Sequence, residues 1–274
     1  MRVATRRAAH QLFDHPRVLE DPIALPIIGS EASAKLEAER SKHQSRMARN
    51  LRAFLVARSR FAEDELARAV DRGVRQYVIL GAGLDTFAYR NLYADQAVRV
   101  FEVDYPATQE WKRGKLAEAG IAIPQSVTYA PVDFERETLA DGLKLAGFDL
   151  SKAAFFSWLG VTMYLTEDAV MATLGLIAST QPGGGVAFDY AVPRSSLNWI
   201  GRMALDALSY RVAAAGEPFR TFFEPGMLAE QLRRIGFRQV TDLDANEINA
   251  QYFKDRADRL RVTGRIGHLM SAEV

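Results

Sequence analysis

The sequence predicts an α/β protein built on a doubly wound, mostly parallel sheet of seven strands. From residue 76 onward, short apolar runs of strand length alternate with helical stretches. Strands that are apolar at consecutive positions are buried on both faces, which is typical of a parallel sheet covered by crossover helices. Such sheets bind ligands at the carboxyl ends of their central strands, so we expect the functional residues at that edge.

The expected elements follow one another along the whole chain. Residues 31–72 contain few helix breakers and carry apolar side chains at helical spacing, so we expect them to be helical. Strands are expected at 76–80, 98–103, 127–130, 153–158, 186–190, 237–244 and 265–272. Further helices are expected at 107–119, 167–180, 194–215 and 225–235.

The composition excludes several classes of protein. The 274 residues are 48% hydrophobic and 25% charged, which is ordinary for a globular protein, and none is cysteine. The absence of cysteine rules out disulfides, thiolate metal sites and a cysteine nucleophile. Because 35 basic residues face 34 acidic ones, no strong overall field favours nucleic acid or an anionic membrane as a partner.

We expect no targeting or membrane segment. The opening residues 1–16 lack the apolar core of a secretion signal, and the longest apolar stretch, 153–165, is too short to span a bilayer. The expectation is a cytoplasmic protein without a membrane or nucleic-acid partner. Its oligomeric state is left open by the sequence.

A Gly-X-Gly turn follows the first expected strand. Gly81, Ala82 and Gly83 come directly after the apolar run YVIL, where a sharp bend and a close approach to a ligand favour glycine. Asp104 ends the second expected strand, 21 residues after Gly83. A carboxylate about 20 positions on accepts hydrogen bonds from the ribose hydroxyls of a bound nucleoside. Together the turn and the acid predict a cofactor that contains a nucleoside.

The residues after the turn distinguish between cofactors. A dinucleotide-binding turn requires a third glycine, and Thr86 stands there instead, preceded by Asp85. A carboxylate at this point would repel a pyrophosphate, but it suits a ligand with an ammonium or sulfonium group. The pattern favours S-adenosylmethionine over NAD. An NAD-linked oxidoreductase and a nucleoside-cofactor-binding protein without catalysis remain the alternatives.

An acid and an aromatic residue follow the third expected strand. Asp133 can accept a hydrogen bond from an adenine amino group, and Phe134 can pack its ring on the base. Taken alone the pair is more typical of an ordinary loop. In register with the turn and Asp104, it indicates the adenine end of a cofactor site.

Five segments of the chain resemble a known family. They are VARSRFAEDEL (56–66), YVILGAGLDTFAYR (77–90), FEVDYP (101–106), PVDFE (131–135) and GVTMYLT (160–166). The set is similar to the leucine carboxyl methyltransferase family, which comprises class I S-adenosylmethionine-dependent O-methyltransferases. The opening RRAAHQLFDHP and LEDPIA resemble its bacterial branch. The resemblance implies a Rossmann-like methyltransferase fold with N-terminal helices and a helical lid insert.

The resemblance also implies roles for individual residues. Arg58 would pair with the methionine carboxylate of the cofactor, and Gly81, Ala82 and Gly83 would line its methionine side. Asp104, with Tyr105 beside it in the same motif, would hold the ribose.

The remaining implied roles concern the adenine end and the pocket walls. Asp133 and Phe134 would bind the adenine end, and Arg6 lies where relatives place another basic residue that contacts the cofactor. Eukaryotic members carry a cofactor-contacting glutamate where this chain has Leu159, so Leu159 and Trp158 are expected to be pocket walls only.

The replacement of that glutamate leaves the amino group of the cofactor without its usual acceptor. Asp85, or backbone carbonyls after the fourth strand, would have to serve.

One domain, residues 1–274, is expected, because no repeat, low-complexity tract or Gly/Ser/Pro-rich linker divides the chain. Within it we expect an N-terminal helical cap (1–72), a cofactor-binding core (73–190), a lid insert and helix (191–236), and the final strands (237–274).

The expected reaction is methyl transfer to a carboxylate or hydroxyl of a small-molecule acceptor. A carboxylate is ionised at neutral pH and needs no general base, whereas a hydroxyl needs one. No catalytic residue can be assigned. No metal is expected, because none of the four histidines forms a metal-type pair; they are His10, His15, His43 and His268.

The insert 194–223 is rich in large apolar side chains. They are Trp199, Met203, Leu208, Tyr210, Phe219, Phe222 and Phe223. Two interpretations remain open: these residues belong to the core, or they form an acceptor pocket beside the reaction centre. A flexible cover of this kind would exclude water from the reaction.

Overall fold

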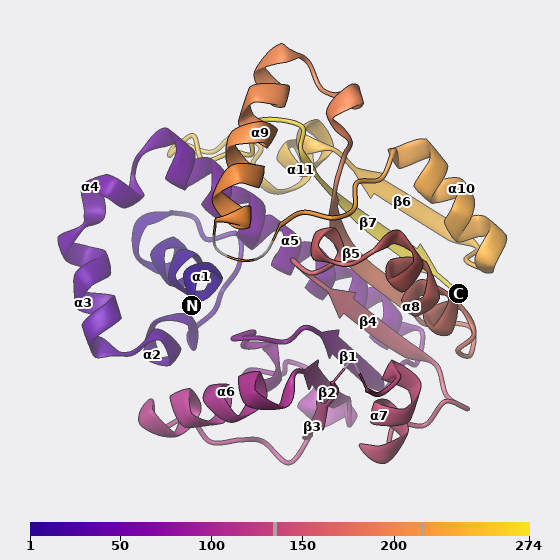
Figure 1. Ribbon diagram of the computed structural model, residues 1–274. Coiled ribbons are helices and arrows are strands. Elements are labelled where there is room, and N and C mark those ends of the chain that lie inside the picture. The colour runs from indigo at the N-terminus through magenta and orange to yellow at the C-terminus, as the bar shows by residue number, and fades with distance from the viewer. Residues whose placement is uncertain (134–135, 215, 217) are drawn as a thin grey trace.

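A seven-stranded sheet forms the centre of the computed structural model, which describes residues 1–133, 136–214, 216 and 218–274 (Figure 1). The strands are β1 (Gln76–Leu80), β2 (Arg99–Asp104), β3 (Val127–Pro131), β4 (Ala154–Trp158), β5 (Gly185–Ala191), β6 (Gln239–Leu243) and β7 (Gly267–Glu273). Their order is β3-β2-β1-β4-β5-β7-β6. Strands β1 to β5 pair in parallel, and β7 is antiparallel to β5 and β6. The predicted doubly wound, mostly parallel sheet is confirmed.

Helices surround the sheet (Figure 1). They are α1 (Arg2–Phe13), α2 (Ala24–Ile28), α3 (Ser30–Ala38), α4 (Arg40–His43), α5 (Arg46–Asp71), α6 (Pro106–Glu118), α7 (Leu139–Leu145), α8 (Glu167–Ala178), α9 (Trp199–Ala213), α10 (Pro225–Ile235) and α11 (Ala245–Tyr252). Short 3-10 turns lie at Phe87–Tyr89, Ala94–Gln96, Thr162–Tyr164 and Arg194–Ser196.

The expected helix over 31–72 is divided into α3, α4 and α5. Ser45 has an extended backbone, with φ −58° and ψ 149°, and its hydroxyl accepts a hydrogen bond from Ala48 N at the start of α5. An N-cap serine therefore begins a new helix at this point. The apolar spacing identified the helical segments but not the breaks between them.

Two helices, α7 and α11, were not predicted from the sequence. Each begins at a side-chain cap: Thr138 accepts from Asp141 N, and Asp244 forms a capping box with Glu247. The capping signal of α11 is visible in the sequence as D-x-x-E at 244–247. Both helices have fewer than nine residues, however, and so short a segment shows too few apolar positions to reveal helical spacing.

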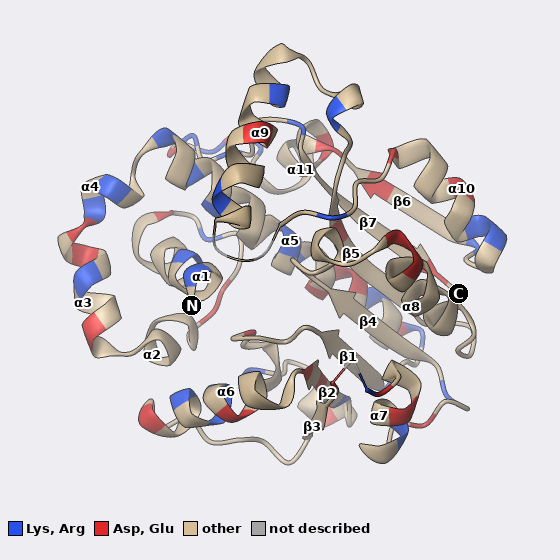
Figure 2. Ribbon diagram, in the orientation of Figure 1, with Lys and Arg blue, Asp and Glu red and all other residues tan. Residues whose placement is uncertain are grey.

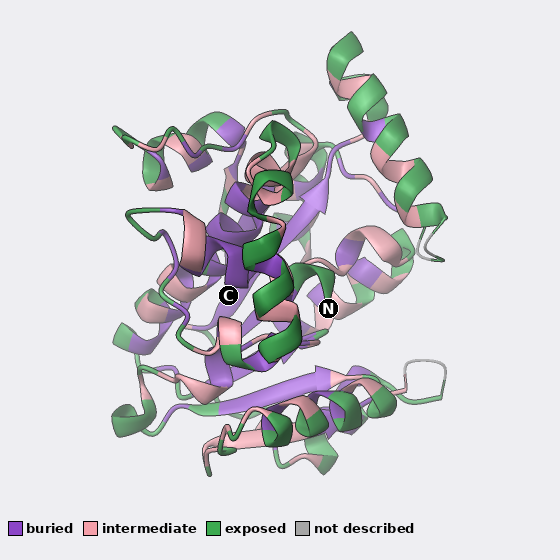
Figure 3. Cartoon of the chain, turned by 90° about the vertical axis from the view of Figure 1, so that its left-hand side faces the viewer, coloured by how far each residue is buried: buried purple, intermediate pink, exposed green. Residues whose placement is uncertain are grey.

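The two faces of the sheet bury two separate hydrophobic clusters. Along β1, Tyr77 and Ile79 belong to one cluster, and Val78 and Leu80 belong to the other. Side chains alternate between the faces of a strand, so all five residues of β1 are buried. This two-sided burial explains the consecutive apolar run in the sequence, and Figure 3 shows it as strands coloured buried beneath helices with exposed outer faces.

A third cluster packs the N-terminal helices against the turn after β1. It joins residues of α1, α2 and α3 to Leu84 in that turn and to Leu116 of α6. Asp14, which ends α1, accepts hydrogen bonds from Arg52 of α5 at 2.6 and 2.8 Å. These contacts hold α1 close to the carboxyl edge of the sheet.

Helix α9 exposes its large apolar side chains. Trp199, Met203 and Tyr210 are 70%, 64% and 78% exposed, and Leu205 is the buried residue of this helix. The interpretation of these three side chains as core residues is therefore wrong. Phe223, in contrast, is buried against the sheet.

Basic and acidic residues are interspersed on several outer helices, whereas α4 and the first part of α5 carry basic residues without acidic ones. Figure 2 shows both signs alternating on α3 and α6 rather than gathered by sign. None of the described helices is both long enough and apolar enough to cross a membrane.

Candidate active site

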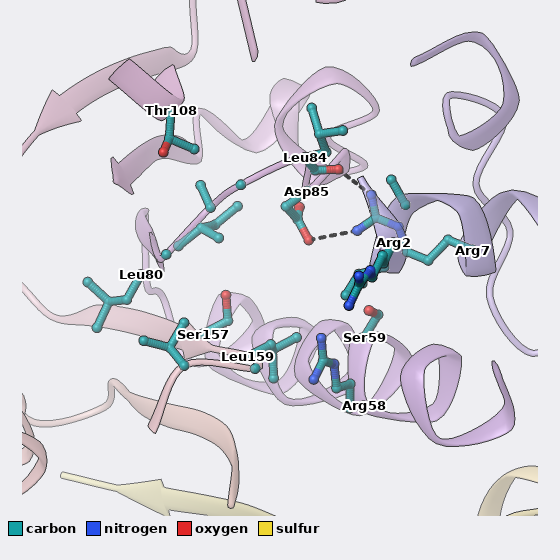
Figure 4. Close-up of a pocket in the computed structure, with 18 of the residues that line it drawn as sticks. Arg2, Arg7, Arg58, Ser59, Leu80, Leu84, Asp85, Thr108, Ser157 and Leu159 are labelled. Atoms are coloured by element: carbon teal, nitrogen blue, oxygen red, sulfur yellow. Dashed lines mark hydrogen bonds and ion pairs between the residues drawn. The ribbon is translucent and has the colours of Figure 1, made fainter. Parts of the chain in front are cut away.

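A cavity of about 540 Å³ lies at the carboxyl ends of β1 and β4 (Figure 4). It is lined by residues of α1, α5 and α6 and by the segments that follow the two strands. Its volume is within the range of small-molecule sites, and its place is the one at which doubly wound sheets bind ligands.

The Gly-X-Gly turn forms one side of this cavity. Gly81 N and Ala82 N both donate to Val103 O of β2, at 2.9 and 3.0 Å. Gly81 and Gly83 have φ values of +67° and +46°, a region that favours glycine. A Cβ at position 81 would lie 2.5 Å from Cγ2 of Val161. All three residues of the turn line the cavity, as the sequence predicts.

Asp104 closes the turn from the end of β2. Its Oδ2 accepts a hydrogen bond from Gly83 N at 2.6 Å, and its Oδ1 accepts one from Tyr105 N at 2.7 Å. Asp104 is half-buried beside the turn and does not itself line the cavity, and Tyr105 is 53% exposed. Each carboxylate oxygen keeps a further lone pair that can accept a ligand hydroxyl.

Asp85 faces the cavity from the end of the turn. Its Oδ1 accepts a hydrogen bond from Phe87 N at 2.8 Å, and its Oδ2 lies 3.4 Å from Arg7 Nη1 (Figure 4). Burial acts to raise the pKa of Asp85, but the charges of Arg7 and Lys112 outweigh it and hold the pKa below its usual range. Asp85 therefore presents an ionised carboxylate to the cavity.

Arg58 lines the cavity from α5 and forms a buried ion pair with Asp189. Its Nη1 donates to Oδ2 of Asp189 at 2.8 Å, and both side chains are at most 9% exposed. Asp189 was missed from the sequence. An acid within the apolar run VAFDYAV is the signal that could have found it, because a buried carboxylate requires a partner.

Two further arginines line the cavity from α1. Arg2 lies beside Arg58 and Ser59 in Figure 4, and Arg7 also donates to Leu84 O. Arg6, which the resemblance pointed to, is not among the lining residues. Arg2 and Arg7 were not predicted, because the position of α1 over the cavity depends on packing against α2 and α5.

The end of β4 forms the floor of the cavity. Ser157 lines it, and the Ser157 hydroxyl accepts a hydrogen bond from Tyr77 at 2.8 Å. Leu159 also lines the cavity, as expected. Trp158 points to the opposite face of the sheet, where it is buried in the second hydrophobic cluster. The alternation of side chains along a strand accounts for this, so Trp158 is not a wall of this cavity.

Asp133, which the sequence assigns to the adenine end, lies beyond the cavity. Asp133 follows β3, and its Oδ2 lies 3.7 Å from Arg136 Nε, outside the lining of the cavity. Phe134 lies outside the described residues.

The described lining has a marked chemical bias. It contains three guanidinium groups, from Arg2, Arg7 and Arg58, but one carboxylate, Asp85, and no histidine. Groups of three or more histidine, aspartate or glutamate residues arranged to hold a metal are absent from the described part of the chain. The site is therefore suited to an anionic group, and among the described lining residues the one carboxylate is already paired with Arg7.

Solved structures share the fold. A protein from Thermobifida fusca, titled "a putative methyltransferase", aligns over 99% of this chain and 93% of its own, with a TM-score of 0.58 and 17% identity. A DUF574 family protein from Streptomyces avermitilis aligns over 91% of this chain and 94% of its own, with a TM-score of 0.55 and 16% identity. The sheet and its helices thus form a Rossmann-like methyltransferase fold.

Sequence relatives define the class of protein. A Bacillus subtilis protein named "Putative S-adenosyl-L-methionine-dependent methyltransferase YktD" is 32% identical over 283 aligned positions, covering 94% of this chain and 91% of the relative. A relative from Saccharopolyspora erythraea with the same description is 32% identical and covers 99% of this chain and 93% of itself. The protein is an S-adenosyl-L-methionine-dependent methyltransferase.

The family follows from a match over more than half of the chain. The profile of the leucine carboxyl methyltransferase family matches residues 1–178, and the chain belongs to this family. An NAD-linked oxidoreductase and a binding protein without catalysis are thereby set aside.

The cavity suits the amino-acid end of this cofactor. Guanidinium groups of Arg2 and Arg58 can pair with a carboxylate, and the ionised Asp85 can accept hydrogen bonds from an ammonium group. Val161 leaves no room for a Cβ at Gly81, so this part of the cavity lining stays bare backbone. The residues present therefore fit S-adenosylmethionine.

Proposed function

We propose that this methyltransferase transfers a methyl group to the oxygen of a small-molecule acceptor, and that this oxygen belongs to a carboxylate. The observation that carries the proposal is the lining of the cavity: Arg2 presents a second guanidinium group beside Arg58, and neither a histidine nor an unpaired acid lies among the described lining residues. A carboxylate is already ionised at neutral pH and needs no base, whereas a hydroxyl does.

The cofactor is proposed to lie across the carboxyl edge of the sheet. Arg58 would bind its carboxylate and Asp85 its amino group, while Gly81, Ala82 and Gly83 would line its methionine side. Arg58 comes from α5 and Asp85 from the turn after β1, and both line the same cavity (Figure 4).

The ribose and adenine contacts extend this proposal beyond the cavity. Asp104, with Tyr105 beside it, would accept the ribose hydroxyls through its remaining lone pairs. Asp133 and Phe134 would bind the adenine end after β3.

The residues of this chain would act mainly by alignment. When bound, S-adenosylmethionine supplies a methyl group that its positive sulfur already activates. Arg2 would attract and orient the acceptor carboxylate, and α1 and α6 would shield the reacting groups from water. Holding the attacking oxygen in line with the methyl group is the main contribution that such a site can make.

A chemical test distinguishes an ester product from an ether. The protein is incubated with methyl-labelled S-adenosylmethionine and a panel of small carboxylic acids, each paired with the corresponding primary alcohol. We expect labelled products from the acids, and we expect mild alkali to release the label as methanol. Alkali-stable label formed from the alcohols would contradict the proposal.

A further inference from the structure

Asp189 is a buried acid in the middle of the sheet. It lies in β5, where every residue is buried, and the exposed fraction of Asp189 is 1%. Its Oδ2 accepts the hydrogen bond from Arg58 Nη1 at 2.8 Å, and its Oδ1 accepts one from Gly160 N at 2.5 Å. The carboxylate thus ties α5 to the segment after β4, two parts of the cavity lining.

The backbone of Asp189 reinforces this link. Its carbonyl oxygen accepts a hydrogen bond from Thr162 Oγ1 at 2.6 Å, so the same residue holds the segment after β4 at a second point. A buried carboxylate is tolerated only with strong partners, and here a guanidinium and a backbone N–H supply them.

Gly160 packs against the guanidinium of Arg58. A Cβ at position 160 would lie 2.8 Å from Arg58 Nη2 and 2.9 Å from Nη1, so the guanidinium rests directly against the glycine. Gly160 also has a φ of +74°, which favours glycine. Asp189 engages one end of the guanidinium, Gly160 supports it, and the group faces the cavity (Figure 4).

We propose that Asp189 is a positioning residue for cofactor binding: it holds the guanidinium of Arg58 in the orientation that receives the cofactor carboxylate. This inference rests on the proposed role of Arg58. A free arginine side chain has many rotamers, and a fixed guanidinium loses less entropy when it binds a carboxylate. Asp189 therefore acts on the ligand through Arg58 and does not touch it.

Two ligands separate this role from a structural one. S-adenosylhomocysteine carries the amino-acid carboxylate, and 5′-methylthioadenosine has the same nucleoside and thioether without it. A residue that acts through Arg58 changes affinity for the first ligand alone, whereas a residue that merely supports the fold changes both.

The central variant is Asp189→Asn, which preserves shape and can still accept from Gly160 N, but turns an amide N–H₂ toward Arg58. We expect the affinity for S-adenosylhomocysteine, measured by calorimetry, to fall about tenfold, the size of one charge-assisted hydrogen bond. The affinity for 5′-methylthioadenosine should stay within about twofold.

Further variants show that the effect passes through Arg58. In Arg58→Met the preference for S-adenosylhomocysteine should fall to the part that the contact of its amino group with Asp85 supplies, and adding Asp189→Asn should reduce affinity no further. If Arg58→Met does not fold because Asp189 is left unpaired, the double variant, which removes both charges, takes its place. The control is Asp242→Asn, another paired acid of the sheet, which contacts Tyr190 and His268 away from the cavity. It should leave the preference unchanged.

The possible failures are distinguishable. If Arg58→Met lowers the preference but Asp189→Asn does not, or if Asp189→Asn weakens both ligands alike, the positioning role is wrong and the proposed function stands. Tighter binding of S-adenosylhomocysteine to Asp189→Asn would mean that Asp189 competes with the ligand, and this also overturns the inference. If neither variant alters the preference, the role of Arg58 in the proposed function fails as well.

Discussion

The two sides of the cavity are built in different ways. The turn wall consists of residues 81–85, and Val103 and Asp104 of β2 accept hydrogen bonds from its backbone N–H groups. The arginine wall consists of Arg2, Arg7 and Arg58, of which Arg7 and Arg58 are buried and held by acidic side chains.

This difference predicts which substitutions destabilise each wall. The turn wall depends on backbone conformation, so the loss of a glycine should damage it. The arginine wall depends on charges that compensate each other in a poorly solvated place, so an unpaired charge should damage it more, and acid should weaken it.

The largest expected effect is that of Arg7→Met in the arginine wall. Arg7 lies 3.4 Å from Asp85 and 3.6 Å from Asp21, so its removal leaves a half-buried and a buried acid less compensated. We expect the free energy of unfolding in urea at neutral pH to fall by about 4 kcal/mol. The matched control, Arg6→Met, should cost about 1 kcal/mol or less. Equal losses would remove the distinction between these neighbouring arginines.

The next effect tests the turn wall. In Gly81→Ala the new Cβ meets Val161, a side chain with few rotamers, at 2.5 Å, and φ is +67°. We expect a loss of about 3 kcal/mol in the free energy of unfolding from overpacking and strain together. Gly83→Ala has a positive φ but space for the Cβ, so it should cost about 1 kcal/mol. The comparison fails if Gly83→Ala is the more damaging change.

Acid should weaken the attachment of the arginine wall at Asp14, which ties α1 to Arg52 of α5. Burial acts to raise the pKa of Asp14, but hydrogen bonds from Arg52 and His10 outweigh it and lower the pKa from 3.8 to about 2. Because the folded-state pKa is the lower one, this carboxylate stabilises the fold above about pH 4, and the contribution, about 2 kcal/mol, is lost as the pH falls toward about 2.

The comparison of the protein with Asp14→Asn measures this contribution. The difference in their unfolding free energies should shrink by about 2 kcal/mol between about pH 5 and about pH 2. A difference that stays constant over this range would show that Asp14 is not the acid-sensitive attachment.

The smallest effect concerns the floor between the walls. Tyr77→Phe removes the hydrogen bond to Ser157, whose hydroxyl lines the cavity. We expect a loss of about 1 kcal/mol by urea unfolding, the net value of one neutral hydrogen bond. A loss as large as that of Arg7→Met would show that the floor contributes as much to stability as the arginine wall does.

The sequence predicted the sheet and the turn wall well, because both depend on local patterns. Each of the seven strands begins within two residues of its expected start, because consecutive apolar positions indicate a strand that is buried on both faces. Gly81 and Gly83 line the cavity as expected, because a tight turn after a buried strand requires glycine. The methyltransferase class followed from the same motifs.

The arginine wall was predicted only in part. Arg58 was found through the family motif, but its partner Asp189 lies 131 residues further along the chain, and no local pattern joins the two. Arg2 reaches the cavity because α1 packs on α5, a tertiary contact. Trp158 was misplaced because one residue along a strand changes the face to which a side chain points.

A crystal structure with S-adenosylhomocysteine tests the central claim most directly, namely that the cofactor lies between the turn wall and the arginine wall. The account predicts a ligand carboxylate within hydrogen-bond distance of Arg58, an amino group at Asp85 or the backbone of the turn, and ribose hydroxyls at Asp104. A ligand bound away from the cavity, or one whose carboxylate and ribose lie beyond the reach of Arg58 and Asp104, would contradict it.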